Sequence, residues 1–226
     1  CPYGFMERFR PNWINIHSNY QGRYTYQNQP SIGHWNLWTW LNNLIPLATP
    51  EHKEQFKQDL ATCLEQFEPI FLHHYGQGLC EKMGLPHFHK DSLDCSFAFL
   101  RILQTEQLDY TQSFIRLQNK EYKALRDDCL DLRQFDAFLH QYQEIRKTQE
   151  RDELDRVMQS ANPHYILRNH MAQKAIELAE RGDFSEVERL FKLLNQPYLK
   201  QPDLETEQDT APLPSDVPEI MVSCSS

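Results

Sequence analysis

Apolar side chains recur every three or four residues along most of this chain, and that spacing favours helices. A helix predicted from Ser31 onward shows the pattern most clearly. The residues on its apolar face are Ile32, Trp35, Trp38, Leu41 and Ile45. Runs that alternate apolar and polar residues are few, so no convincing strand is predicted. The sequence therefore predicts a mainly α fold, and we expect this tryptophan-rich face to form part of a core.

Start and stop signals divide the rest of residues 31–196 into further helices, about eight in all. Thr49 and Pro50 predict a helix start, and Pro69 is expected to kink or end that helix. A second segment is expected to stop at Gly84. The later start signals are Asp91, Asp109, Asn162 with Pro163, and Ser185. A helix is also predicted around Phe135, Phe138, Leu139 and Tyr142, and Gly182 is expected to end the helix that starts at Asn162.

Residues 1–30 differ from the helical part because they are rich in proline, glycine, asparagine and aromatic residues. This composition predicts an ordered loop held by aromatic side chains. Arg23 and Tyr24 are candidate loop-organising residues, because a guanidinium group can stack on aromatic rings and form bidentate hydrogen bonds. The chain has no initiator methionine, and its start is typical of the middle of a protein. We therefore expect a missing upstream segment.

Charge and hydropathy exclude two classes of partner. The formal net charge is -9, so the chain is poorly suited to bind nucleic acid. The longest apolar stretch is broken by Asn42, Asn43 and Pro46, which predicts that no segment spans a membrane. Residues 197–226 are acidic and proline-rich, and we expect them to form a flexible tail ending in Ser-Cys-Ser-Ser.

The cysteines and histidines show no metal-binding pattern. His73, His74, His87 and His89 lie near Cys80, but adjacent helical histidines point about 100° apart, which does not suit a zinc site. No metal ligand is therefore predicted. Cys63, Cys80, Cys95 and Cys129 are expected to act as small buried apolar residues. Cys224 lies in the polar terminus and is the candidate redox thiol.

Catalytic motifs are also absent from the sequence. His17, Ser18 and Asn19 are adjacent and cannot form a nucleophile relay without an unusual turn. The segment from Gly76 to Gly78 follows a predicted helix and lacks the partners of a phosphate-binding loop. No catalytic or cofactor-binding residue is predicted from the residues alone.

Several ordered motifs together resemble the SelO/YdiU family of protein-kinase-like proteins. The N-terminal motifs are P-Y-G-F, then P-N-W-I-x-x-H-S-N-x-x-G-R-Y-x-Y-x-N-Q-P over residues 11–30, and W-N-L over residues 35–37. The later motifs are D-Y-T over residues 109–111, N-P-x-Y-I-L-R-N over residues 162–169, Gly182-Asp183, Pro197-Tyr198 and the closing Ser-Cys-Ser-Ser. The resemblance covers almost the whole chain, which makes it more specific than any single motif.

The resemblance implies a pseudokinase that acts as a protein adenylyltransferase. Such proteins bind ATP with Mg²⁺ or Mn²⁺, inverted relative to ordinary kinases, and transfer AMP to serine, threonine or tyrosine hydroxyls of protein substrates. The substrate hydroxyl would attack the α-phosphate, and pyrophosphate would leave. The resemblance also implies a soluble protein of the bacterial cytoplasm or of mitochondria.

The chain departs from the family pattern at two places. Cys1 stands at the last position of the family's metal-binding Asp-Tyr-Gly triplet, so the metal-binding and phosphate-binding residues would lie upstream. We therefore carry over no catalytic or ATP-binding residue, and expect this chain alone neither to bind ATP tightly nor to transfer AMP. Asn15 aligns with the loop cysteine that pairs with the family's C-terminal thiol, so Cys224 is expected to be a free reactive thiol.

These observations predict the C-terminal lobe of a protein-kinase-like fold with a helical extension, whose N-lobe and catalytic loop are absent from the chain. Residues 1–30 would form an activation-type loop segment, residues 31–196 the helical lobe and extension, and residues 197–226 the tail. The expected partners are protein substrates and the missing N-terminal lobe. Two alternatives remain open: a stand-alone helical interaction module with a groove on residues 31–47, and a truncated or decayed gene product without activity.

Overall fold

The computed structural model describes residues 6–14, 22–86, 89–147 and 151–211. These residues form helices joined by short loops and contain no strand, which confirms the mainly α prediction. The first helices are η1 (Tyr26–Asn28), α1 (Gln29–Leu44), η2 (Ile45–Leu47), α2 (Lys53–Glu65), α3 (Phe67–Met83) and α4 (Lys90–Thr105). The following ones are α5 (Tyr110–Gln118), α6 (Tyr122–Asp127), α7 (Leu132–Lys147), α8 (Arg151–Ala161), α9 (Asn169–Ala179), α10 (Ser185–Asn195) and α11 (Glu207–Thr210).

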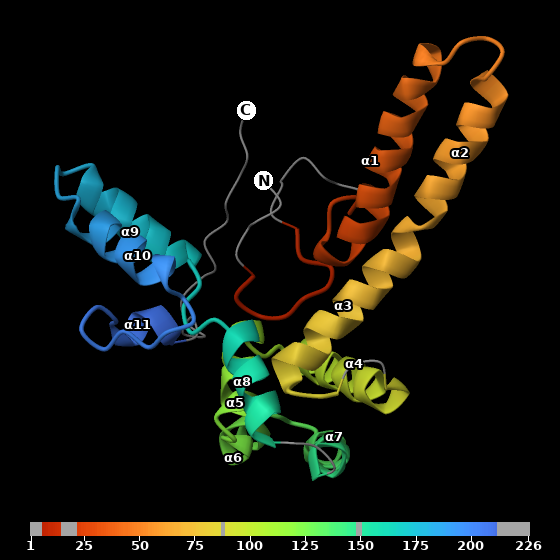
Figure 1. Cartoon of the computed structure of the whole chain (residues 1–226). Helices are drawn as coiled ribbons and strands as arrows, with labels where there is room; N and C mark the ends of the chain where they lie inside the picture. The colour runs from red at the N-terminus through yellow and green to blue at the C-terminus, as the bar shows by residue number, and fades with distance from the viewer. Residues whose placement is uncertain (1–5, 15–21, 87–88, 148–150, 212–226) are drawn as a thin grey trace.

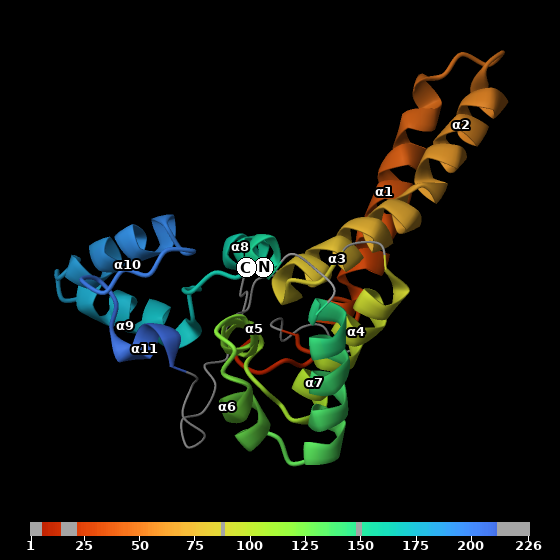
Figure 2. The same ribbon diagram turned by 60° about the horizontal axis from the view of Figure 1, so that its bottom comes forward.

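The helices form three groups, which Figures 1 and 2 show from two directions. Helices α1 and α2 form an antiparallel pair that projects away from the rest of the molecule. Helix α3 continues from this pair into the central group, which contains α4 to α8. Helices α9, α10 and α11 form the third group, on the other side of the central helices (Figure 1).

The main hydrophobic core lies in the central group. Phe99 of α4 is fully buried and packs against Phe138 of α7, with ring centroids 4.9 Å apart, and against Phe114 of α5 at 5.2 Å. The C-terminal half of α3 adds Leu79 and Met83 to the same core. A smaller core joins α9 to α10 and consists of Tyr165, Met171, Ala175, Leu190 and Leu193. The central group and the third group therefore each have a hydrophobic core of their own.

Local signals set several helix ends as predicted. Asp109 caps α5, since its carboxylate accepts a hydrogen bond of 2.8 Å from the backbone N–H of Gln112. Gly84 follows α3 in the left-handed conformation, with a φ of 58°. Helix α10 begins at Ser185.

The prediction that the apolar face of α1 lies in a core is wrong for the described residues. Helix α1 contains no buried residue, and the side chains of Trp35, Trp38 and Trp40 are 45%, 51% and 58% exposed. Among the longer helices, α2 and the start of α3 pack along this helix, and a helical pair cannot enclose a broad apolar face. A large apolar surface therefore faces solvent on the projecting pair.

Three predicted helix boundaries also differ from the structure. Helix α2 starts at Lys53, three residues after Pro50, and Pro69 lies in the first turn of α3, where its missing N–H has no helical partner to lose. The helix predicted from Asn162 begins at Asn169 instead. Asn162 is buried and donates a hydrogen bond of 2.8 Å to the backbone carbonyl of Lys82, which holds this segment against α3.

Residues 197–211 were assigned to a flexible tail, and the structure contradicts this part of the prediction. Asp209 of α11 is buried and accepts two hydrogen bonds from Arg189 of α10, at 2.7 and 2.9 Å. Thr206 and Asp209 also form a capping box at the start of α11. The buried carboxylate is stabilised by this pairing, which composition alone does not reveal. Residues 212–226, including Cys224, lie outside the described residues.

No helix among the described residues combines the length and the apolar character needed to cross a membrane.

Candidate functional site

The loop segment predicted for residues 1–30 is described over residues 6–14 and 22–30, and its two parts lie side by side. The backbone N–H of Gln27 donates to the carbonyl of Pro11 at 2.9 Å, and that of Tyr26 donates to Trp13 at 3.0 Å. Phe9 is buried, and its N–H donates to the carbonyl of Leu108 at 2.8 Å. The two parts of the segment are therefore joined by backbone bonds, and Phe9 fixes the segment to the central group through one backbone bond and its buried ring.

A buried ion-pair cluster connects this segment to two distant parts of the chain. The Nη1 atom of Arg168 lies 2.6 Å from the carboxylate of Glu7 and 2.6 Å from that of Asp109. The side chains of all three residues are at least 92% buried. The two carboxylates raise the pKa of Arg168, although burial opposes this. The cluster thereby joins the loop segment, the cap of α5 and the residue before α9.

The two predicted loop-organising residues lie next to α1. The guanidinium carbon of Arg23 is 4.3 Å from the ring centroid of Trp35 and 5.6 Å from that of Tyr24. This stacking connects residues 22–25 to the first turns of α1. Arg23 and Tyr24 are exposed. Their predicted role in organising the loop stays a prediction.

Metal-ligating side chains do not gather anywhere in the described part of the chain. No group of three or more histidine, cysteine, aspartate or glutamate side chains there has a geometry that can hold a metal ion. His73 and His74 lie edge to face, with ring centroids 5.1 Å apart. His87, one of the four histidines considered above, lies outside the described residues. The part of the chain that the structure describes therefore offers no such cluster for Mg²⁺ or Mn²⁺.

The cysteines divide by burial. Cys80, Cys95 and Cys129 are buried, and burial raises the pKa of each, to about 12 for Cys95 and about 11 for Cys129. They are inert small apolar residues, as predicted. Cys63 on α2 is exposed, which contradicts the same prediction for it, because the projecting helical pair has no core.

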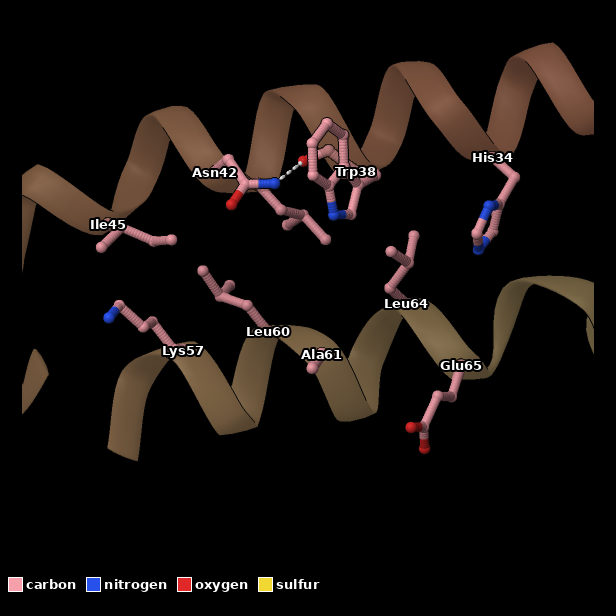
Figure 3. Close-up of a pocket in the computed structure, with 10 residues that line it drawn as sticks. His34, Trp38, Asn42, Ile45, Lys57, Leu60, Ala61, Leu64 and Glu65 are labelled. Carbon is pink, nitrogen blue, oxygen red and sulfur yellow. Dashed lines mark hydrogen bonds between the residues drawn. The ribbon is translucent and has the colours of Figure 1, made fainter. Parts of the chain in front are cut away.

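Two hollows border α1, and one of them also borders the loop segment. The first lies between α1 and α2 and has a volume of about 440 Å³. Figure 3 shows Trp38 and Ile45 of α1 facing Leu60 and Leu64 of α2 across it. The second is a groove of about 540 Å³ between the loop segment, the start of α1, α3 and α4. Both hollows are mainly apolar.

A partly buried lysine, missed by the sequence analysis, lies between α3 and the end of α8. The Nζ atom of Lys82 donates to the carbonyl of Ala161 at 3.0 Å and to the side chain of Asn162 at 3.3 Å. It also lies 5.4 Å from the ring centroid of Phe114. No carboxylate of the described residues pairs with it, and burial lowers the pKa of Lys82 to about 8.

We expect this lysine to make the chain more stable at alkaline pH. The pKa in the folded state lies below the 10.5 of an exposed lysine, so between pH 8 and 10.5 the unfolded state binds more protons. The free energy of unfolding should therefore rise with pH across this window, by up to about 3 kcal/mol. Urea titrations of the natural chain and of Lys82→Met measure the effect. The rise in the free energy of unfolding with pH should be lost in the variant. An equal rise between pH 8 and 10.5 in both proteins would contradict the prediction.

Arg168 and Glu7 were also missed, although Arg168 lies in the quoted run from Asn162 to Asn169. The local pattern shows a charged residue after three apolar or aromatic ones, which is common on surfaces. Only the fold brings Glu7, Asp109 and Arg168 together. Asp109 was predicted correctly as a helix cap, but its second role as an ion-pair partner has no local signal.

Comparison with known proteins identifies the chain's relatives. Residues 1–195 match the family described as protein adenylyltransferase SelO. The chain is 37% identical over its whole length to a protein nucleotidyltransferase YdiU of Pectobacterium atrosepticum, and covers 46% of that protein. It is 36% identical to the YdiU proteins of Methylococcus capsulatus and Klebsiella pneumoniae, with 100% and 89% of this chain and 46% and 42% of the relatives aligned.

These relatives carry the name protein nucleotidyltransferase. The chain belongs to the SelO family. It spans about half the length of the curated relatives that it matches.

Proposed function

We propose that this chain forms the helical part of a protein adenylyltransferase that transfers AMP from ATP to serine, threonine or tyrosine hydroxyls of proteins. In this proposal the helices are the C-terminal lobe of a protein-kinase-like fold with its extension, and ATP with Mg²⁺ or Mn²⁺ is bound by another part of the longer polypeptide. Membership of the SelO family supports the reaction type.

The observation that carries the proposal is the exposure of three tryptophan side chains on α1, of which Trp35 and Trp38 lie on the predicted apolar face and Trp40 lies on another side of the helix. Trp35, Trp38 and Trp40 are each about half exposed on one 16-residue helix. Burying one large apolar side chain typically stabilises a protein by about 1.5–3 kcal/mol, so leaving three of them in water is costly. Exposed large apolar side chains gathered on one helix are typical of an interface. The segment that covers it would be the N-terminal part of the longer polypeptide.

The proposal assigns the loop segment to the border of the nucleotide cleft. Residues 6–14 and 22–30 are held rigidly by Arg168 and by backbone bonds, and they lead directly into the tryptophan face. A preformed loop in this place can position a protein substrate without a large ordering cost. Arg23 and Tyr24 would organise the loop there, through the stack on Trp35.

The chain by itself is expected to bind no Mg-ATP and to transfer no AMP. Isothermal titration of Mg-ATP into the isolated chain should show no tight binding, because the family's metal-binding and phosphate-binding residues would lie in another part of the longer polypeptide. A polypeptide of the relatives' full length, titrated in the same buffer, is the positive control. Micromolar binding by the isolated chain would overturn this part of the proposal.

The tryptophan face also favours a second candidate, a stand-alone helical interaction module. The hollow of about 440 Å³ between α1 and α2 could hold a side chain of another protein (Figure 3). Tryptophan fluorescence discriminates between the two candidates. A blue shift in the full-length polypeptide relative to this chain indicates that the rest of the same protein covers the face. An unchanged spectrum favours the interaction module.

A further inference from the structure

The groove between the loop segment and α4 has an apolar floor made of side chains from three parts of the chain, namely the loop segment, α3 and α4. These residues are Phe9, Phe71, Tyr75, Phe97 and Leu100. Phe9 and Leu100 are buried, and Phe71 stacks on Tyr75 with ring centroids 5.5 Å apart. The volume of about 540 Å³ exceeds that of any single side chain. The floor therefore has room for a large apolar group from outside.

The charge at this groove is the opposite of the charge of the whole protein. Arg101 is the one charged residue among those that line it, and no aspartate or glutamate is present there. The side chain of Arg101 is exposed and forms no ion pair within the described part of the chain. Because the protein as a whole has a net charge of -9, this cation attracts an acidic group to one side of an apolar floor.

The rim of the groove is open. Leu72 of α3 and Tyr26 of η1 border it and are 55% and 40% exposed. Sites for small molecules typically enclose most of the ligand, whereas this groove leaves one side in solvent. A protein segment fits such an opening better, because its backbone can remain at the rim while one side chain enters.

The groove is also preformed. Its loop wall is fixed by the bond from Gln27 to the carbonyl of Pro11 and by the bond from Phe9 to the carbonyl of Leu108. Its helical wall is α4, which belongs to the main core through Phe99. Binding therefore requires little ordering of the protein, which leaves more of the contact energy for affinity.

We propose that this groove docks an extended segment of a substrate protein, in which an aromatic or large aliphatic side chain lies close to a carboxylate. The apolar side chain enters between Phe71 and Phe97, and the carboxylate pairs with Arg101. The role as a substrate dock rests on the proposed function, since it is the protein substrate of AMP transfer that would supply the segment. Docking itself requires no nucleotide.

Fluorescence anisotropy with defined peptides tests this on the 226-residue chain. The probe is a short fluorescein-labelled glycine–serine peptide that carries one phenylalanine and one glutamate. Matched peptides replace the phenylalanine by alanine, or the glutamate by glutamine or lysine. The alanine peptide should bind at least about tenfold more weakly. Arg101→Glu should weaken binding of the glutamate peptide about fivefold and make the lysine peptide the tighter ligand.

Arg133→Glu is the matched control, because Arg133 is exposed on α7 and makes the same charge change away from the groove. Its peptide affinities should equal those of the natural chain.

The proposal is overturned if Arg133→Glu and Arg101→Glu have the same effect on peptide affinity, or if the glutamate and glutamine peptides bind the natural chain equally. It is also overturned if the full-length polypeptide does not bind the probe, since the rest of that protein then fills the groove. Self-association of the chain that Leu72→Glu abolishes would instead assign the groove to a second copy. None of these assays contains ATP, so failure of the proposed nucleotide chemistry leaves them unaffected.

Discussion

Replacing Arg168 by methionine is expected to lower the free energy of unfolding by about 3–5 kcal/mol. The side chain of Arg168 is 98% buried between the carboxylates of Glu7 and Asp109, and the substitution removes this cation from both buried acids. The hydrogen bond from Gln112 to Asp109 and the contact of 3.8 Å between His170 and Glu7 remain. Methionine fills much of the vacated volume, so lost electrostatic pairing dominates over a packing defect. Urea denaturation followed by far-ultraviolet circular dichroism measures the change.

A compensated variant separates pairing from packing. Arg168→Met combined with Glu7→Gln and Asp109→Asn removes all three charges, and asparagine can still cap α5. This variant should recover most of the lost stability, because replacing both sides of a buried pair by neutral groups is much less costly than removing one. Arg133→Met changes an exposed arginine and should alter stability by less than about 0.5 kcal/mol. A loss below about 1 kcal/mol in Arg168→Met, or no recovery in the triple variant, would contradict the assigned role.

The same cluster explains why the loop segment can serve the proposed function. Glu7 is separated from Arg168 by 160 intervening positions, yet their side-chain atoms lie 2.6 Å apart. The contact ties the loop wall of the groove to the residue before α9, whose helix packs on α10. Loss of Arg168 should therefore loosen the groove as well as lower stability.

Local sequence signals predicted most of the helices, because caps and periodicity act over a few residues. Asp109, Gly84 and Ser185 mark helix ends in the sequence and in the structure. Asn162 failed as a start signal because its side chain bonds to the carbonyl of Lys82, 80 positions away, instead of capping a helix. Asparagine can cap a helix or form a tertiary hydrogen bond, and in Asn162 the contact with Lys82 decides for the second role.

The candidate site was harder to predict, because its parts are distant in the sequence. The apolar face of α1 was predicted correctly as a pattern, but periodicity indicates which face is apolar and not what covers it. Asp209 was assigned to a flexible tail on composition, whereas its pairing with Arg189 stabilises α11. For the apolar face of α1 and for Asp209 alike, the sequence does not reveal which other part of the protein packs against them.

Replacing Gly84 by alanine is expected to destabilise the chain by about 2–5 kcal/mol, and Gly182→Ala by only about 1–2 kcal/mol. Both glycines have positive φ, 58° and 84°, so alanine strains the backbone at each. At Gly84 the added Cβ would also lie 2.6 Å from the Nη1 atom of Arg146 and 2.7 Å from Met158, whereas at Gly182 it meets nothing within 4 Å.

The contacts at Gly84 cannot relax easily, because Arg146 is held in place. Its guanidinium donates to the hydroxyl of Tyr142 at 3.0 Å and pairs with Asp155, and Tyr142 in turn donates to the carbonyl of Met83. Moving the arginine would break this buried network, so the close approach adds to the backbone strain. Parallel urea titrations of the two alanine variants isolate that contribution as the difference between them. Equal losses at the two positions would mean that the network yields, and that the left-handed backbone alone requires glycine after α3.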